Sequence, residues 1–319
     1  MLGFLNLNKS PGFTSHDCVA KVRRLLQMKQ VGHGGTLDPD ATGVLPIALG
    51  RATRLLQFLP TDKAYHGTIK LGMTTTTDDL AGEIISRHPV NSTQLDLTTI
   101  NQALLQFHGK IDQIPPKYSA IQVEGKRLYD LARSNIAVDI PVRKVEIFEI
   151  KILDWRSSEF PELDVEIACG AGTYIRSIAR DLGAVLGTGG TLAALTRTRS
   201  AGFSLDTSIT LDQLATILDT SNHPHTQKQQ LETWQPISPE VALSHLPQVI
   251  LPAPLGKRWT QGQKIPHIPI INLSGEFIRV AGEDGNLLGI SQVVGHPEGL
   301  SPESVVLVPK VVLVPGTKN

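Results

Sequence analysis

The spacing of apolar residues predicts several amphipathic helices in the first two thirds of the chain. In residues 15–28 the apolar positions recur at helical spacing, Ser15 is the expected N-cap, and basic residues occupy the outer face. The same periodicity predicts helices at residues 51–59, 99–107, 125–133 and 173–186.

Alternation of apolar and polar residues predicts strands between these helices. It is clear at residues 65–71, 145–152 and 163–169. Near the C-terminus, FIRVA and LLGISQVV flank the turn GEDGN, which predicts a hairpin, and VVLVPKVVL adds a further strand. Strands separated by helices predict a central sheet of the α+β class, followed by a small β-rich module.

Composition places the domain boundary. Residues 203–240 are acidic and rich in Thr, Gln and Asp, and they contain SNHPHTQKQQ, which is typical of a poorly packed connector. We therefore expect a large domain at residues 1–235, which includes most of this connector (203–240), and a small domain at 241–319.

Charge and cysteine content limit the binding partners, the metal or disulfide sites and the cellular location that the sequence allows. Thirty basic residues balance thirty acidic ones, but residues 1–60 carry seven Lys/Arg against three acids, which permits a basic face. Cys18 and Cys169 lack the spacing of a zinc site or a disulfide framework. No signal peptide and no apolar stretch of about 18 residues is present, so we expect a soluble, cytoplasmic protein without membrane contact.

The densest candidate chemistry lies in VGHGGTLDPDATG, which is too rich in turn-forming residues to be one helix or strand. Its glycines allow close backbone approach, and Asp38 stands between Leu37 and Pro39. An isolated aspartate in a tight turn is most often a cap. The segment from Asp38 to Thr42 also fits D-x-D-x-T, the motif of Mg²⁺-dependent aspartyl phosphotransferases, although that motif follows a buried hydrophobic strand and V-G-H-G-G-T-L does not resemble one.

A longer pattern resembles a known family. VGHGGTLDPDATGVLPIALGRATR resembles the second motif of the bacterial tRNA pseudouridine-55 synthases, the TruB family. Further segments are similar to other motifs of that family, in the same order: NLNKSPGFTSHD, DKAYHGTIKLG, IPPKYSAIQVEGKRLYDLAR, CGAGTYIRSIARDLG and LTRTRSAGF. The resemblance covers about residues 2–203 and extends more weakly into the C-terminal region.

The resemblance implies both a fold and a reaction. The implied fold has a mixed, largely antiparallel central sheet with flanking helices, and a C-terminal β-barrel-like module of the PUA-like, RNA-binding kind. The implied reaction isomerises the T-loop uridine of tRNA by breaking the C1′–N1 bond, turning the uracil and rejoining it through C5. That reaction requires no cofactor and no metal, the partner is the T stem-loop of tRNA, and a monomer is expected.

The resemblance also assigns catalytic residues. Asp38 corresponds to the essential aspartate, which acts on the ribose either as a nucleophile at C1′ or as a base. Arg176 corresponds to its guanidinium partner, which should orient the carboxylate and lower its pKa. Tyr174 corresponds to a tyrosine suspected of helping to remove the C5 proton.

Substrate contacts follow from the same resemblance. Because the target base must be flipped out, Tyr65 is the implied stacking surface and His33 the residue that helps open the loop. Leu195 and Arg197 should line the pocket and approach the RNA, and Asp79, more than Asp78, should organise the site. Phosphate-neutralising or buttressing roles fall to Lys9 and Lys63, with Arg23, Arg24, Arg51 and Arg54 as candidates for a face that tracks the RNA backbone.

One departure and two alternatives remain. The family has Lys-Pro-x-Gly where this chain has Lys9-Ser10-Pro11-Gly12, so the local turn is expected to differ. A Mg²⁺-dependent phosphotransferase and a non-catalytic RNA-binding or RNA-folding protein are the alternative functions.

Overall fold

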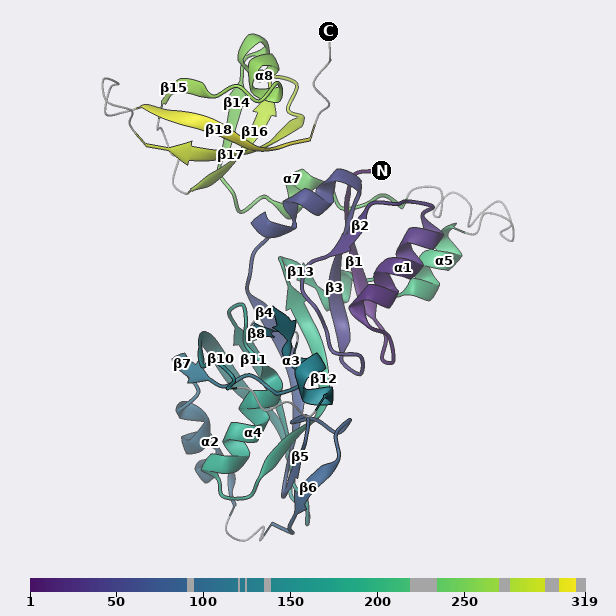
Figure 1. Cartoon of the computed structure of the whole chain (residues 1–319), viewed down its shortest axis with the longest axis vertical. Helices are drawn as coiled ribbons and strands as arrows, with labels where there is room; N and C mark the ends of the chain where they lie inside the picture. The colour runs from purple at the N-terminus through teal and green to yellow at the C-terminus, as the bar shows by residue number, and fades with distance from the viewer. Residues whose placement is uncertain are drawn as a thin grey trace.

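The computed structural model of this chain describes residues 1–90, 95–119, 121–123, 125–134, 139–218, 234–269, 276–295 and 304–313. A large sheet flanked by helices is followed by a smaller, separate sheet at the C-terminal end (Figure 1). None of the helices in this described part is long and apolar enough to cross a membrane.

Nine strands of the described chain form the large sheet. They are β1 (Gly3–Lys9), β2 (Val31–His33), β3 (Thr42–Leu49), β4 (Lys63–Leu71), β7 (Gly109–Gln113), β10 (Arg143–Arg156), β11 (Glu162–Cys169), β12 (Gly190–Ser200) and β13 (Phe203–Ser204). Their order is β1-β3-β12-β4-β11-β10-β7, with β2 beside β3 and β13 beside β12. Paired strands are antiparallel except β3 and β12, which confirms the mixed, largely antiparallel sheet.

Helices and two small hairpins complete the large domain. They are α1 (Ser15–Leu25), the 3-10 helix η1 (Gly50–Phe58), the hairpin β5 (Met73–Thr75) and β6 (Ile84–Arg87), α2 (Leu97–Leu105), the hairpin β8 (Gln122–Val123) and β9 (Lys126–Arg127), α3 (Leu128–Arg133) and α4 (Ile175–Val185). The predicted helices are present, but the one expected at 125–133 starts at Leu128 because the preceding residues form β9.

The N-cap of α1 differs from the prediction. Thr14 caps the helix, and its side chain and that of Asp17 form a reciprocal capping box. Ser15 is buried, and its hydroxyl makes other contacts. The assignment of Ser15 as the cap was therefore wrong by one residue.

The first and third strands are buried on both faces. Leu5, Leu7 and Ile47 pack with α1 in the main core, whereas Phe4 and Ala48 face η1 and the C-terminal module. A strand covered on both sides has a nearly continuous apolar sequence, so alternation did not reveal β3.

The expected connector is partly folded. Its described part contains β13, η2 (Leu205–Thr207) and α5 (Leu211–Leu218), and Leu211 and Leu214 belong to the main core. Figure 1 shows α5 beside α1. Poor packing was thus a wrong prediction for 205–218, because the apolar face of α5 packs against the main core. The segment SNHPHTQKQQ lies outside the described residues.

The C-terminal module is a small β-rich unit, as predicted. Helix α7 (Pro239–Ala242), which contacts β1, precedes it. The module contains β14 (Gln248–Leu251), α8 (Ala253–Thr260), β15 (Ile265–Pro269), β16 (Phe277–Gly282), β17 (Leu287–Val294) and β18 (Ser304–Val312). Its sheet order is β14-β16-β17-β18-β15, and the predicted hairpin of β16 and β17 is confirmed. Trp259 of α8 is fully buried in this module's own core.

The 3-10 helix η1 joins the two parts of the protein. Arg51 and Arg54 donate hydrogen bonds to the carbonyls of Leu313 and Val312, and the ring of Phe58 packs against that of Phe277. The two arginines had been expected on a face that tracks the RNA backbone. Their guanidinium groups bind the end of the C-terminal module, and both residues are exposed, so their contact with RNA stays a prediction.

Candidate active site

Asp38 lies in a loop between β2 and β3 that buried polar side chains hold from both sides. The hydroxyl of Ser15, on the first residue of α1, accepts from the Leu37 amide at 2.9 Å and donates to the Leu37 carbonyl at 3.3 Å. On the other side, Lys9 Nζ and the Gly12 amide donate to the Pro39 carbonyl, at 2.7 and 3.0 Å. The backbone is therefore fixed immediately before and after Asp38.

The turn after β1, at Lys9-Ser10-Pro11-Gly12, contributes to the hydrogen bonding of the Pro39 carbonyl. Gly12 has φ +80°, a conformation that glycine adopts without strain, and its amide reaches the Pro39 carbonyl. Lys9 also donates to the carbonyls of Ser10 and Phe13. The displaced proline is thus compatible with a turn that supports the Asp38 loop.

Arg197 braces the loop from the adjacent strand β12. Its side chain is fully buried, and it donates to the carbonyls of Gly35, Thr36 and Val44 at 3.1, 3.2 and 2.8 Å. Gly43 runs directly against the Arg197 backbone at φ +100°, where an added Cβ would clash with the Arg197 carbonyl. A glycine is required there for the loop to approach β12.

Arg176 holds the carboxylate itself. Its Nε lies 3.0 Å from Asp38 Oδ2 and its Nη2 lies 3.1 Å from Oδ1, so the pair is bidentate. The Arg176 side chain is 6% exposed, whereas that of Asp38 is 43% exposed. The guanidinium is buried behind the carboxylate, and the carboxylate remains accessible.

Arg176 also gathers two other segments around Asp38. It donates to the carbonyls of Thr77 and Tyr118, both at 3.1 Å, and its Nη1 lies 3.5 Å from Asp79 Oδ2. Asp78 does not share this contact, because its carboxylate pairs with Arg180 at 2.9 Å. Three loops therefore meet at the start of α4.

The net pKa of Asp38 is raised, although its guanidinium partner acts in the predicted direction. Desolvation by the surrounding protein raises this pKa most, although 43% of the side chain stays exposed, and the neighbouring carboxylate of Asp79 adds to the effect. Arg176 and Lys9 lower it, as expected for adjacent cations, but burial outweighs them.

The two tyrosines have raised pKa values. Burial raises the pKa of Tyr65 to about 12, and this residue is 6% exposed on β4. Burial also raises the pKa of Tyr174, the N-cap residue of α4, whose backbone groups are bound by the Gln113 side chain. Both hydroxyls therefore keep their protons at neutral pH, so Tyr174 would have to lose a tightly held proton to act as a base.

Lys9 and Arg197 both support the Asp38 loop. They are fully buried and donate to backbone carbonyls of this loop and the adjoining turns. Of the two roles predicted for Lys9, its contacts match buttressing, whereas the burial of Arg197 keeps it off the surface where an RNA contact was expected. Lys63, at the start of β4, is half-buried. Its pKa is lowered mainly by burial and also by the positive charge of Arg197.

His33 and Leu195 lie on strands near the loop. His33 ends β2, its ring packs edge-on against that of His16 with centroids 5.2 Å apart, and burial lowers its pKa. Leu195 is half-buried on β12 and pairs with Gly67 of β4. Their roles toward a substrate stay predictions, as does stacking on Tyr65.

Two supporting residues were not singled out for the site from the sequence. Ser15 had been assigned to a helix cap, and Gln113 had drawn no attention. A buried polar residue at the end of a strand or the start of a helix is a signal for such a role only once its burial is known.

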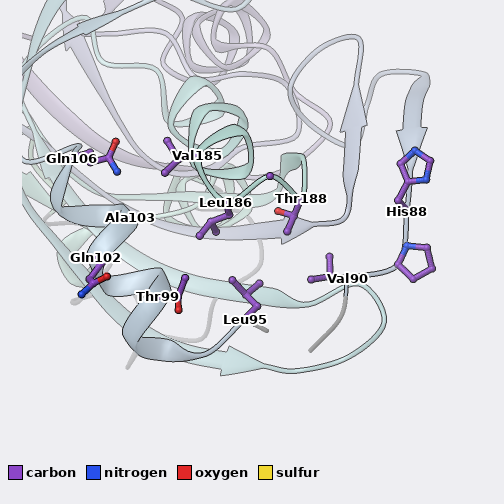
Figure 2. Close-up of a pocket in the computed structure, with 12 residues that line it drawn as sticks. His88, Val90, Leu95, Thr99, Gln102, Ala103, Gln106, Val185, Leu186 and Thr188 are labelled. Carbon is purple, nitrogen blue, oxygen red and sulfur yellow. The ribbon is translucent and has the colours of Figure 1, made fainter. Parts of the chain in front are cut away.

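A separate pocket lies elsewhere in the large domain. Figure 2 shows side chains of α2 and the end of α4 facing the segment around His88 and Val90. It contains none of the residues that contact Asp38. Within the described ranges, no group of three or more His, Cys, Asp or Glu side chains is placed to hold a metal ion.

The arrangement as a whole resembles a chain of known structure from an RNA–protein complex. One similar chain comes from the structure of an H/ACA ribonucleoprotein bound to a substrate RNA containing 2′-deoxyuridine. The match has a TM-score of 0.69 at 25% sequence identity, and it covers 99% of this chain and 86% of that one. The class of fold is that of the pseudouridine synthases.

The sequence comparisons identify the family. Residues 23–175 match the N-terminal domain of the TruB family of pseudouridylate synthases, and 176–253 and 247–306 match two C-terminal domains named for the same proteins. The chain is 53% identical over 317 residues to a tRNA pseudouridine synthase B of Trichormus variabilis, with 99% of each chain covered. It is 50% identical to that of Synechocystis, with 98% of this chain and 100% of the other covered. This chain belongs to the TruB family.

Proposed function

We propose that the protein isomerises uridine to pseudouridine in tRNA, at the T-loop position 55, with Asp38 as the catalytic carboxylate. The observation that carries the proposal is the accessible Asp38 carboxylate held by the buried guanidinium of Arg176. The names of the relatives, tRNA pseudouridine synthase B, support the substrate.

The geometry suits chemistry at a sugar carbon. When the C1′–N1 bond breaks, the ribose develops positive charge, and a fixed carboxylate stabilises that charge or bonds to C1′. The uracil then rejoins through C5, C5 gives up its proton and N1 gains one, so the overall change is an isomerisation. The planar guanidinium of Arg176 binds both carboxylate oxygens of Asp38, so it keeps the carboxylate in one orientation during the reaction.

The alternative functions fit less well. The D-x-D-x-T motif of phosphotransferases ends a buried strand, but a loop separates Asp38 from β2. In addition, Arg176 binds the carboxylate of Asp38. A pure RNA-binding role would leave the buried guanidinium and its accessible carboxylate without a task. The proposed tRNA substrate supports a cytoplasmic location.

The test is an unmodified tRNA transcript incubated with the protein and probed by carbodiimide treatment and primer extension. Asp38→Asn removes a charge but little volume, so pseudouridine formation should be abolished while tRNA binding persists. The matched control is Asp40→Asn, which neutralises an exposed acid two positions away. Pseudouridine formed by Asp38→Asn would refute the catalytic assignment, and binding without modification by the wild-type protein would favour an RNA-binding role.

A further inference from the structure

Helix α4 presents a second arginine to the same loops. Arg180 lies four residues after Arg176, so both side chains emerge from one side of the helix. Arg180 Nη1 lies 2.9 Å from Asp78 Oδ2, its Nη2 donates to the Ile114 carbonyl at 2.9 Å, and its Nε lies 2.8 Å from Asp181 Oδ1.

The contacts of Arg180 parallel those of Arg176. Arg176 binds the Thr77 carbonyl and the Asp79 carboxylate, whereas Arg180 binds the Asp78 carboxylate between them. In the second segment, Arg180 binds Ile114 and Arg176 binds Tyr118. Each loop is thus attached to α4 at two points.

The backbone at Asp78 makes this second attachment consequential. Asp78 has φ +61°, a left-handed conformation that non-glycine residues seldom adopt, and its carbonyl accepts from the Leu192 amide at 3.0 Å. This conformation sends the Asp78 side chain to Arg180 while the carboxylate of the next residue, Asp79, reaches Arg176. The Asp78 side chain is 15% exposed, so water screens the pair little.

We propose that the ion pair of Arg180 and Asp78 is a positioning device for the reaction: it fixes the turn at residues 77–79 so that Asp79 and the Thr77 carbonyl hold the Arg176 guanidinium in line with Asp38. This inference rests on the proposed function. Arg180 and Asp78 pair with each other, whereas Asp38 pairs with Arg176, so Arg180 and Asp78 would act on Asp38 only through Arg176.

The variants Arg180→Gln, Asp78→Asn and their combination test the pair. Asparagine tolerates the left-handed conformation, so Asp78→Asn removes charge without adding backbone strain. Displacing a catalytic group by a fraction of an ångström reduces turnover, so we expect each single variant to lower kcat about tenfold, with KM changed less than about twofold. The double variant should be no slower than the slower single variant, because the two residues work as a unit.

Two further variants separate positioning from stability. Arg180→Lys keeps a cation opposite Asp78 and should recover part of the lost kcat. Asp181→Asn removes the charge of the other acidic partner of Arg180. The Asp181 side chain is 37% exposed, so this variant should behave like the wild type. The melting temperature of every variant is measured beside its kinetics.

The outcomes are distinct. Unchanged kcat in Arg180→Gln, a rise in KM alone, or additive losses in the double variant would overturn the positioning role while leaving the proposed function intact. Loss of kcat that Arg180→Lys does not relieve, accompanied by an equal fall in melting temperature across all variants, would reduce the pair to a stabilising contact. Absence of pseudouridine with the wild-type enzyme would overturn the proposed function itself.

Discussion

Arg176 and Asp38 are joined by two nearly equal contacts, at 3.0 and 3.1 Å, although they lie 138 positions apart in the chain. The guanidinium is buried and the carboxylate is accessible. A buried cation is stable only when its donors are satisfied, and here two carbonyls and two carboxylates satisfy them. The pair therefore presents a fixed, oriented acid at the surface of the site.

Arg176→Lys should reduce kcat by about a hundredfold, because an ammonium group cannot form the two-point fork or reach both loop carbonyls. Single-turnover kinetics on a tRNA transcript measure the loss. Arg199→Lys is the matched control, since Arg199 pairs with Asp62 at an exposed site. Near-normal turnover in Arg176→Lys would show that the fork is dispensable.

The pH dependence of kcat should reveal the raised pKa of Asp38. In the proposed reaction the ionised carboxylate is the active form. Desolvation raises its pKa, so activity should decline at a higher pH than with an ordinary aspartate as the solution is acidified. Asp79→Asn removes a charge that raises the pKa further, so the acidic limb of the profile should move to lower pH. Asp40→Asn, at an exposed position, should leave the pH of the acidic limb unchanged. A shift of the acidic limb to higher pH in Asp79→Asn would contradict the explanation.

Ser15→Ala should destabilise the protein by about 1–3 kcal/mol and also lower kcat, because it leaves the buried Leu37 amide without a partner beside Asp38. Chemical denaturation and turnover are measured together. Ser10→Ala is the control, since Lys9 uses the Ser10 backbone carbonyl and not its side chain. A Ser15→Ala enzyme of normal stability and rate would show that the loop needs no such support.

Arg51→Gln and Arg54→Gln should leave the salt dependence of tRNA binding unchanged, because these arginines bind carbonyls of the C-terminal module. A lost phosphate contact would instead reduce the slope of log affinity against log salt by about 0.7–0.9. The same variants should increase protease cleavage between the two parts of the protein, since their docking contacts are lost. Arg24→Gln, at an exposed position of α1, tests a remaining candidate for a phosphate contact.

Local patterns in the sequence determined the elements with one buried face and the position of the Asp38 loop. Alternation revealed β4, β11 and the hairpin of β16 and β17, because each places apolar and polar residues on opposite sides. The residues around Asp38 and the ordered motifs determined the family, since a glycine-rich loop of that length and identity is specific.

Only the tertiary structure decided the roles of the supporting residues. The sequence did not reveal β12, because Arg197 and Thr191 occupy buried positions that a strand usually gives to apolar side chains. Nor did it show that Ser15 and Lys9 fix the backbone on either side of Asp38, or that burial raises the pKa of that carboxylate. Hydrogen bonding and desolvation depend on atoms that folding brings together from distant parts of the chain, so no local pattern encodes them.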